Sequence, residues 1–208
     1  MEVRAINTVV ERDIQEIISD SQIFDAFRGK LILVTGATGL IGSMVARSLI
    51  AANDAYHLSL RVICHVRNIE KAHHMFSDIV DSDILTFVDT PLESLDIACD
   101  YIMHGAAPTK SKYFVEHPVD TIRTSIHGTE RMLELGKEQK IKGMVYLSSM
   151  EQYGVPYESG QVMTEDRIGY LDHLNVRSSY SESKRLCECY CKSYAVEFGV
   201  PVKIARLA

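Results

Sequence analysis

A glycine-rich turn between a predicted strand and a predicted helix constrains this chain more than any other feature. The turn reads Thr35-Gly36-Ala37-Thr38-Gly39-Leu40-Ile41-Gly42 and follows the continuously apolar run Leu31–Val34. Such a run is typical of a strand buried on both faces of a parallel sheet. The glycine spacing permits a tight turn, the close approach of a pyrophosphate and close packing of the helix on the strand. It favours dinucleotide binding over a purely structural turn. The residues expected to face the phosphates are Gly36, Thr38, Gly39, Leu40 and Ile41.

The rest of the chain alternates short β-branched runs with longer helical stretches. We predict strands at 31–35, 60–66, 84–88, 101–104, 144–148 and 202–206. We predict helices at 40–51, 70–76, 119–138 and 179–198, and a short turn at 92–97. Crossovers of this length indicate right-handed βαβ units. The expected fold is α/β, a Rossmann-type, doubly wound, parallel six-stranded sheet in the order 3-2-1-4-5-6.

Residues 30–208 are expected to form one dinucleotide-binding domain. Residues 1–29 are expected to be an N-terminal helical extension. Val10, Ile14, Ile17 and Ile18 follow helical spacing there, so this helix should pack on the sheet or on a partner.

Composition excludes several classes of protein. With 208 residues and 46% hydrophobic content, the chain is neither intrinsically disordered nor a disulfide scaffold. A net charge of −6 does not provide the excess of basic residues that binding to a nucleic-acid backbone requires. The longest uncharged apolar run, 31–46, has 16 residues and three glycines, which is too short and too broken to span a bilayer. Without a secretory pattern at its start, the chain is expected to be cytoplasmic.

Cysteine and histidine spacing predicts no metal site. Cys187, Cys189 and Cys191 alternate within a predicted helix, where residues two apart point to nearly opposite sides. We therefore expect buried, reduced cysteines.

The end of the second strand bears on the choice of cofactor. It reads His65-Val66-Arg67-Asn68, with an arginine where an acidic residue would favour NAD. Arg67 suits the 2′-phosphate of NADP, although exposed arginines are common at strand ends. Asp89 ends the third strand and would either accept a hydrogen bond from adenine or cap the next turn.

A tyrosine and a lysine form the candidate catalytic pair. Tyr180 and Lys184 are four residues apart, so both lie on one face of the predicted helix. A tyrosine acts as an acid–base catalyst near neutral pH when its pKa is lowered, and we expect the neighbouring ammonium to lower it. Ser149 follows the fifth strand, at the sheet edge where ligands of parallel sheets bind.

These motifs resemble the extended short-chain dehydrogenase/reductase superfamily, in its nucleotide-sugar epimerase/dehydratase branch. The resemblance covers residues 29–207, with His104-Gly105-Ala106-Ala107 and Tyr180-x-x-x-Lys184 among its marks. It implies that Ser149 binds the substrate oxygen, that Tyr180 takes its proton and that Lys184 binds the ribose. It also implies cofactor contacts from Gly105, Ala106 and Ala107, and a homodimer formed through helices 119–138 and 179–198.

A narrower similarity points to UDP-glucuronate decarboxylases. It rests on Ala106-Ala107-Pro108-Thr109 and on Arg177, three residues before Tyr180. It implies that Thr109 and Arg177 bind substrate and that Glu151 is catalytic. Once the 4-hydroxyl is a ketone, a carboxylate can shuttle the acidic hydrogen of the 5-position. Alternatively, Glu151 orders Arg177 or a backbone amide. Met150 replaces the aspartate of sugar dehydratases, which disfavours dehydration.

The expected function is therefore an NAD- or NADP-dependent nucleotide-sugar epimerase, dehydratase or decarboxylase that passes through a 4-keto sugar. Two alternatives stay open: a reductase or dehydrogenase of a small carbonyl compound, and a dinucleotide sensor on the same fold. Members of the family continue beyond the sixth strand into a lobe that chooses the sugar. The chain is expected to lack this lobe, either as a truncated form, which we favour, or as a cofactor-binding domain that works with another chain.

Overall fold

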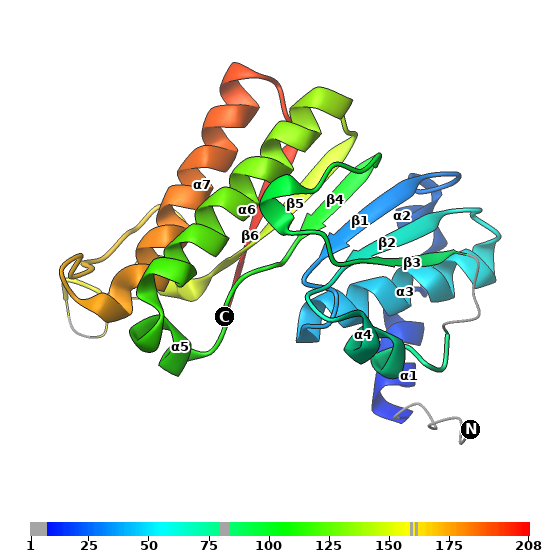
Figure 1. The fold of residues 1–208 in the computed structure, drawn as a ribbon, viewed down its shortest axis with the longest axis horizontal. Coiled ribbons are helices and arrows are strands. Elements are labelled where there is room, and N and C mark those ends of the chain that lie inside the picture. The colour runs from blue at the N-terminus through cyan, green and yellow to red at the C-terminus, as the bar shows by residue number, and fades with distance from the viewer. Residues whose placement is uncertain (1–7, 80–83, 159, 161) are drawn as a thin grey trace.

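The computed structural model describes residues 8–79, 84–158, 160 and 162–208. Six strands form one sheet in the order β3-β2-β1-β4-β5-β6, and every neighbouring pair is parallel (Figure 1). Both the α/β class and the predicted strand order are confirmed. The strands are β1 (Leu31–Thr35), β2 (Arg61–His65), β3 (Leu85–Val88), β4 (Tyr101–His104), β5 (Gly143–Ser149) and β6 (Val202–Leu207).

Helices cover both faces of the sheet. One face carries α1 (Thr8–Ile17), α2 (Ser21–Asp25), α3 (Leu40–Tyr56) and α4 (Ile69–Met75). The other face carries the long pair α6 (Pro118–Gln139) and α7 (Ser179–Glu197), together with the 3-10 turn η1 (Leu92–Ser94) (Figure 1). The remaining short elements are α5 (Ser111–Glu116), η2 (Met150–Tyr153) and η3 (Val176–Ser178).

The apolar run of β1 divides between the two cores. Ile32 and Val34 belong to the cluster under α3, whereas Leu33 belongs to the cluster under α6 and α7. Leu33 and Val34 are fully buried. Alternate side chains of a strand point to opposite faces, so a strand covered on both sides needs apolar residues at every position.

The N-terminal segment packs on the α3 face. Ile14, Ile18 and Phe24 are buried in the cluster that α3 covers, while Ile17 points outward and is exposed. The short helix α2 was not predicted from the sequence. Its N-cap is Asp20, whose side chain accepts a hydrogen bond from the backbone N–H of Gln22. The division of the chain at residue 30 stays a prediction.

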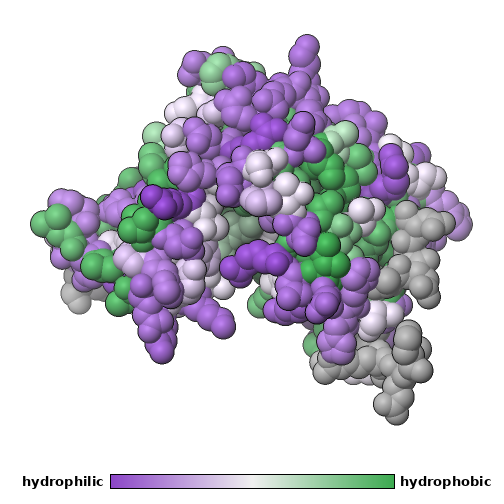
Figure 2. Space-filling view, in the orientation of Figure 1, coloured by the Kyte–Doolittle hydropathy of each residue, from purple (hydrophilic) through white to green (hydrophobic). Residues whose placement is uncertain are grey.

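A long loop between η2 and η3 presents apolar side chains to solvent. Val155, Ile168 and Leu174 are 64%, 59% and 83% exposed. Hydrophobic side chains accordingly gather at the end of the molecule where this loop lies (Figure 2). Among the described residues, no helix has the length and apolar character needed to cross a membrane.

Candidate active site

The glycine turn after β1 forms a cradle made of backbone. Gly36 has a φ of 72°, and a Cβ there would lie 2.8 Å from the carbonyl of Gly105. A Cβ on Gly42 would lie 2.3 Å from the carbonyl oxygen of Gly36. Gly39 is the N-cap of α3 and brings no side chain to that position. Side chains are thus kept away from a helix N-terminus, an arrangement that fits the pyrophosphate of a dinucleotide.

The first two residues of α3 are apolar and exposed to solvent. Leu40 is 82% exposed and Ile41 is 42% exposed, although both belong to the first turn of an otherwise well-packed helix. Thr38, in the turn itself, is half-buried. This surface lies beside the cradle.

A threonine at the end of β1 holds the turn that follows β4. The Thr35 hydroxyl accepts hydrogen bonds from the backbone N–H groups of Gly105 and Ala106, both at 3.2 Å. It also lies 2.7 Å from Nδ1 of His104. The two amides occupy both acceptor sites of the hydroxyl oxygen, so the hydroxyl donates its one hydrogen to His104 Nδ1. The two turns of the predicted cofactor site are therefore braced together by one side chain.

His104 continues this brace to α6. Its Nε2 lies 3.2 Å from the hydroxyl of Thr129, which donates its own hydrogen to the carbonyl of Ser125. Nε2 therefore carries the ring proton and donates it to Thr129. Burial lowers the pKa of His104 to about 3, so the ring is neutral near pH 7. His104 is a structural part of the site.

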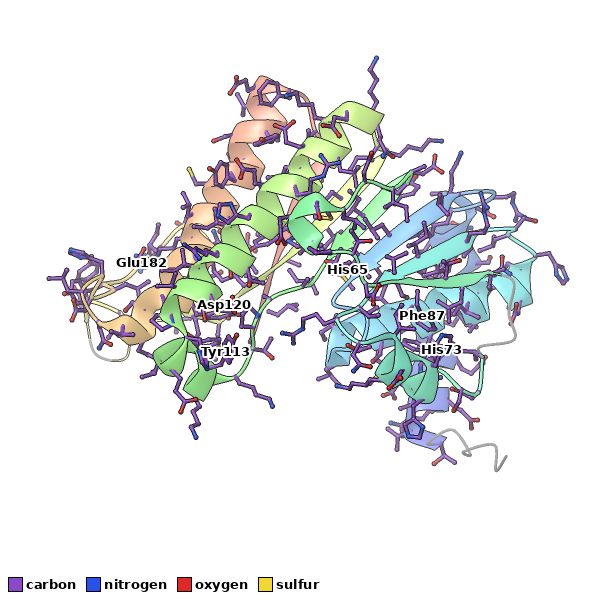
Figure 3. The ribbon with its side chains drawn as sticks, in the orientation of Figure 1. His65, His73, Phe87, Tyr113, Asp120 and Glu182 are labelled. Atoms are coloured by element: carbon purple, nitrogen blue, oxygen red, sulfur yellow. The ribbon has the colours of Figure 1, made fainter. Side chains whose placement is uncertain are left out.

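The rim of the cradle is formed by the ends of β2 and β3. Arg67 is exposed there, next to Asn68, whose side chain caps α4 by accepting the Lys71 N–H at 2.7 Å. His65, which is labelled in Figure 3, is the last residue of β2. Its Nε2 lies 2.8 Å from the carbonyl of Thr90. Asp89 is also exposed. The N-cap of η1 is Pro91, so the interpretation of Asp89 as the cap of that turn is wrong; its contact with adenine stays a prediction.

Tyr180 and Lys184 both lie in the first two turns of α7, beside the end of β5. Tyr180 is 8% exposed, and its ring stacks on Phe114 at 4.3 Å between centroids. Burial raises the pKa of Tyr180, whereas contact with the Ser149 hydroxyl lowers it. The net direction is upward. The expectation of a lowered phenol pKa is therefore wrong.

The position of Lys184 explains this result. Its Nζ donates a hydrogen bond of 2.7 Å to the carbonyl of Leu147 and lies 5.6 Å from the centroid of the Tyr180 ring. Lys184 is 4% exposed, and desolvation lowers the pKa of its ammonium to about 8. The cation is thus held against β5.

Glu151 is held by a bidentate ion pair. Arg177 Nη1 and Nη2 donate to its two carboxylate oxygens at 2.9 and 2.8 Å, and the Ser181 hydroxyl donates at 3.1 Å. These bonds lower the pKa of Glu151. The guanidinium also lies 4.9 Å from the centroid of the Phe114 ring. Glu151 therefore orders Arg177, as the alternative interpretation expects, and its catalytic role stays a prediction.

The other predicted residues are more scattered. Ala107 is half-buried and Thr109 is exposed in the segment between β4 and α5. Cys187 and Cys191 are buried and reduced as expected, but Cys189 is exposed because it lies on the outer side of α7. In the part of the chain that the structure describes, no group of three or more histidine, cysteine or acidic residues is placed to hold a metal ion.

Sequence reasoning missed Phe114 and Thr35. Phe114 forms the stack under Tyr180, yet the two residues are far apart in the chain and share no sequence pattern. Thr35 did carry a signal, since it is a polar residue that ends a buried apolar strand directly before Gly36. A buried hydroxyl at such a place needs partners, and here they are the amides of the neighbouring turn.

Known proteins share both the sequence and the fold. Residues 32–208 match the NAD dependent epimerase/dehydratase family. UDP-glucuronic acid decarboxylase 1 of Danio rerio is 30% identical over 183 residues, which are 86% of this chain and 41% of that protein. UDP-glucuronic acid decarboxylase 6 of Arabidopsis thaliana is 31% identical over 180 residues, which are 85% of this chain and 49% of that protein. The chain thus spans at most about half the length of these relatives.

Solved structures agree on the fold. A UDP-glucuronic acid 4-epimerase from Bacillus cereus, in complex with UDP-glucuronic acid and NAD, superposes with a TM-score of 0.70 at 24% identity. The match covers 85% of this chain and 55% of that one. The epimerase Mth375 of Methanothermobacter thermautotrophicus gives a TM-score of 0.74 at 24% identity, over 92% of this chain and 55% of that one. Because the family match spans residues 32–208, the chain belongs to the NAD-dependent epimerase/dehydratase family.

Proposed function

We propose that this chain binds NAD or NADP and carries the redox machinery of an enzyme that oxidises the 4-position of a nucleotide sugar. The single observation that carries this proposal is the gathering of Ser149, Tyr180 and Lys184 at the sheet edge that also carries the glycine cradle. A base, a hydroxyl donor and a cation beside a dinucleotide cradle are the groups that alcohol oxidation needs.

The residues divide the work as follows. The bound dinucleotide supplies the acceptor for the hydride from the sugar carbon. Tyr180 takes the proton of the 4-hydroxyl, and the Ser149 hydroxyl donates a hydrogen bond to the same oxygen. Burial raises the pKa of Tyr180, so its resting form is the neutral phenol, and it becomes a base for the 4-hydroxyl only after its own proton is lost to solvent. Lys184, whose pKa is about 8, adds positive charge on the same helix face.

For the substrate, we favour a nucleotide sugar that carries a carboxylate. The relatives are named as UDP-glucuronic acid decarboxylases, and Arg177 offers a guanidinium beside Tyr180. Arg177 is 37% exposed through its side chain, so an anion can reach it. Hydrogen bonds from Arg177 and Ser181 lower the pKa of Glu151, so it is ionised near neutral pH and is a poor acid for the leaving hydroxyl that dehydration must protonate. These features favour decarboxylation or epimerisation over dehydration.

Dinucleotide binding is the first test, because the chain spans about two fifths of the Danio rerio relative. Mass spectrometry of small molecules released from the purified protein distinguishes NAD from NADP. Arg67, exposed at the end of β2, favours NADP. If it binds a 2′-phosphate, Arg67→Ser weakens NADP about tenfold or more and leaves NAD binding unchanged in calorimetry.

Turnover is the second test. The protein is incubated with UDP- and dTDP-sugars, and we expect a sugar product without net consumption of cofactor. Tyr180→Phe should abolish the reaction. Tyr190→Phe is the matched control, since Tyr190 lies on the same helix and packs on Tyr194. Stoichiometric loss of NADPH with a small carbonyl substrate would instead support the reductase that Arg67 favours.

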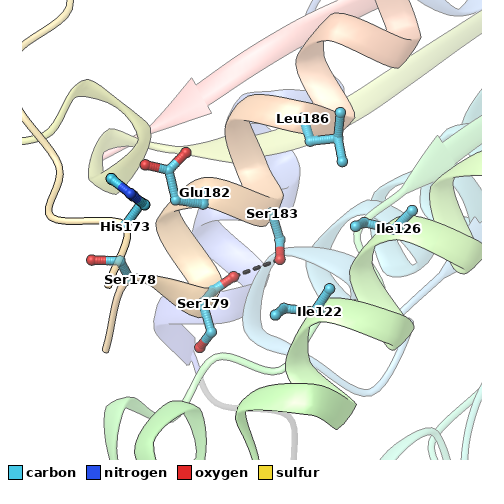
Figure 4. Close-up of a pocket in the computed structure, with 8 residues that line it drawn as sticks. All are labelled: Ile122, Ile126, His173, Ser178, Ser179, Glu182, Ser183 and Leu186. Carbon is cyan, nitrogen blue, oxygen red and sulfur yellow. Dashed lines mark hydrogen bonds between the residues drawn. The ribbon is translucent and has the colours of Figure 1, made fainter. Parts of the chain in front are cut away.

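We further propose that the chain pairs with a second copy through α6 and α7. Ile122 and Leu186 are 39% and 45% exposed and border a pocket of about 230 Å³ between these helices (Figure 4). Apolar side chains on adjacent outward helix faces favour a self-complementary interface. Sedimentation of Leu186→Glu should show monomers where the parent shows dimers. Val196→Glu, on an exposed position of the same helix, should leave the mass unchanged.

A further inference from the structure

A nearly buried ion pair lies directly behind the end of β5. Glu188 follows Lys184 by one turn of α7, and Arg206 lies on β6. Arg206 Nη2 donates to Glu188 Oε2 at 2.7 Å, and Arg206 Nε reaches both carboxylate oxygens at 3.1 Å. The Ser148 hydroxyl donates to Oε1 at 2.5 Å. The Glu188 and Arg206 side chains are only 10% and 23% exposed. The pair therefore ties α7, β5 and β6 together one residue before Ser149.

The same arginine holds the loop that follows β5. Arg206 Nη1 donates to the Tyr153 hydroxyl at 3.3 Å and to the carbonyl of Glu165 at 2.9 Å. Its guanidinium also lies 5.0 Å from the centroid of the Tyr153 ring. The Arg206 side chain thus spans from the carboxylate of α7 to Tyr153 at the start of this loop and to Glu165 within it.

A second arginine holds that loop from α7. Arg185 Nε donates to the carbonyl of Gln152 at 2.7 Å. Its Nη2 donates to the carbonyls of Tyr153 and Gly169 at 3.2 and 2.9 Å. Two arginines consequently hold η2, which carries Glu151, and the residues Glu165 and Gly169 of the loop that follows it. One of them is neutralised by Glu188.

Glu188 and Lys184 are both buried residues of α7, and their spacing of four residues places them on the same side of the helix. The titratable groups around Lys184 are Tyr180, Cys187, Glu188 and Cys191 from α7, Tyr146 from β5 and His104 from β4. Burial raises the pKa of both phenols and both thiols and lowers that of His104, so these five are neutral near pH 7. The carboxylate of Glu188 is therefore the negative charge in this shell, and it opposes the desolvation of Lys184.

We propose that Glu188 and Arg206 are positioning residues, which couple the charge of Lys184 to the placement of the loop that carries Glu151. The proposal rests on the proposed function, since it assigns the pair to that machinery. Removing Arg206 and removing the Glu188 charge should change the environment of the Lys184 ammonium in opposite directions. Loss of Arg206 leaves Glu188 unshielded beside Lys184, whereas loss of the Glu188 charge leaves Lys184 desolvated without compensation. Both losses release the loop.

The first measurement is the titration of Lys184. Lysine 13Cε NMR, with the signal assigned by Lys184→Met, reports its pKa in the folded chain. Glu188→Gln should lower this pKa by about one unit, and Arg206→Gln should raise it. Glu197→Gln, at an exposed position at the end of α7, is the control and should leave it unchanged. A purely structural role for the pair would not move the pKa in opposite directions.

The second measurement is cleavage of the loop by trypsin. Arg167 is exposed and is the one lysine or arginine in segment 150–176. Glu188→Gln and Arg206→Gln should both speed cleavage after Arg167 about tenfold or more, because the loop then opens more often. Arg206→Lys keeps the positive charge but loses the planar guanidinium that donates to Glu188, Tyr153 and Glu165 together. It should therefore speed cleavage while leaving the pKa of Lys184 as in the parent chain.

An unchanged Lys184 titration in both glutamine variants, or shifts of the same sign, would overturn the proposal. So would unchanged cleavage at Arg167. If Glu188→Gln does not fold, Arg206→Lys and Arg206→Gln decide the question through the same two measurements. Neither measurement requires cofactor or sugar. Failure of dinucleotide binding would therefore sink the proposed function while leaving this coupling measurable.

Discussion

The two halves of the candidate site are built by opposite means. The half around β1 and α3 is made of glycines, backbone amides and neutral hydroxyl and imidazole groups. A Cβ on Gly36 or Gly42 would meet backbone atoms closer than 3 Å. The half around β5 and α7 is held by charged side chains, including Glu151 with Arg177 and Glu188 with Arg206. The first half is shaped by steric exclusion, the second by electrostatics.

This difference implies different responses to change. Backbone in close contact cannot yield by a few tenths of an ångström without moving a strand or a helix, so the cradle should lose stability when it is altered. The Glu151–Arg177 pair is partly exposed and contributes less to folding. Altering it should instead shift the ionisation of its neighbours.

The largest expected effect is in the cradle. Gly42→Ala places a Cβ 2.3 Å from the Gly36 carbonyl oxygen and should lower the free energy of unfolding by about 3 kcal/mol in urea titrations. Dinucleotide binding should be lost with it. Gly29→Ala is the control. Gly29 has a φ of 68° but nothing within 4 Å of its Cβ position, so strain alone should cost about 1 kcal/mol. Equal losses for the two variants would remove the steric argument.

The next effect is the pH dependence of the neutral brace. His104→Leu leaves the buried hydroxyls of Thr35 and Thr129 without their ring partner and should cost about 2 kcal/mol at pH 7. The folded pKa of His104, about 3, lies below its unfolded value of 6.5. Its contribution is therefore complete above pH 6.5 and is lost as the pH falls toward 3.

The stability gap between the parent and His104→Leu should therefore close on acidification. By linkage the parent loses about 2 to 3 kcal/mol from this group by pH 4.5. Urea titrations at pH 7 and pH 4.5 measure the gap. His74→Gln, at an exposed histidine of α4, should show no such dependence. A gap that widens at low pH would mean that His104 is charged in the folded state.

The smallest effect is at the partly exposed Glu151–Arg177 pair, where stability should barely change. Glu151 raises the pKa of Tyr180 and Arg177 lowers it. Glu151→Gln should therefore lower the pKa of Tyr180 and Arg177→Gln should raise it, each by less than about one unit. Ultraviolet difference titration against Tyr180→Phe isolates this phenol. Shifts in the same direction would show that the two charges act on Tyr180 through the fold rather than directly.

The fold was largely readable because its signals are local. β1 and β4 were predicted to the residue, since a strand buried on both faces reads as an unbroken apolar run. The third helix was predicted to end at Ala51 but continues to Tyr56, because nothing in the intervening residues breaks a helix. It ends at His57, which adopts a φ of 49°. A glycine at this position would have predicted a left-handed residue and the end of the helix, whereas a histidine does not.

The site was readable only where its residues are close in the chain. The glycine spacing and the Tyr180–Lys184 interval are local patterns. The partners that fix them are distant: Thr35 and His104 are 69 residues apart, and Ser148 and Glu188 are 40 apart. The direction of the Tyr180 pKa shift was missed for the same reason. It depends on burial against Phe114 and on the hydrogen bond of Lys184 to β5, which helix spacing does not contain.

The stack of Tyr180 on Phe114 gives the protein its own reporter. The two rings are nearly parallel, with 2° between their planes. Each ring therefore lies in the aromatic shielding zone of the other, and the proton signals of Phe114 should stand upfield of ordinary phenylalanine positions. The chain has no tryptophan but ten tyrosines, so optical probes average over many sites. A ligand that draws the phenol away from Phe114 would move these signals back, and α5 would register the arrival of a substrate at α7 without any label.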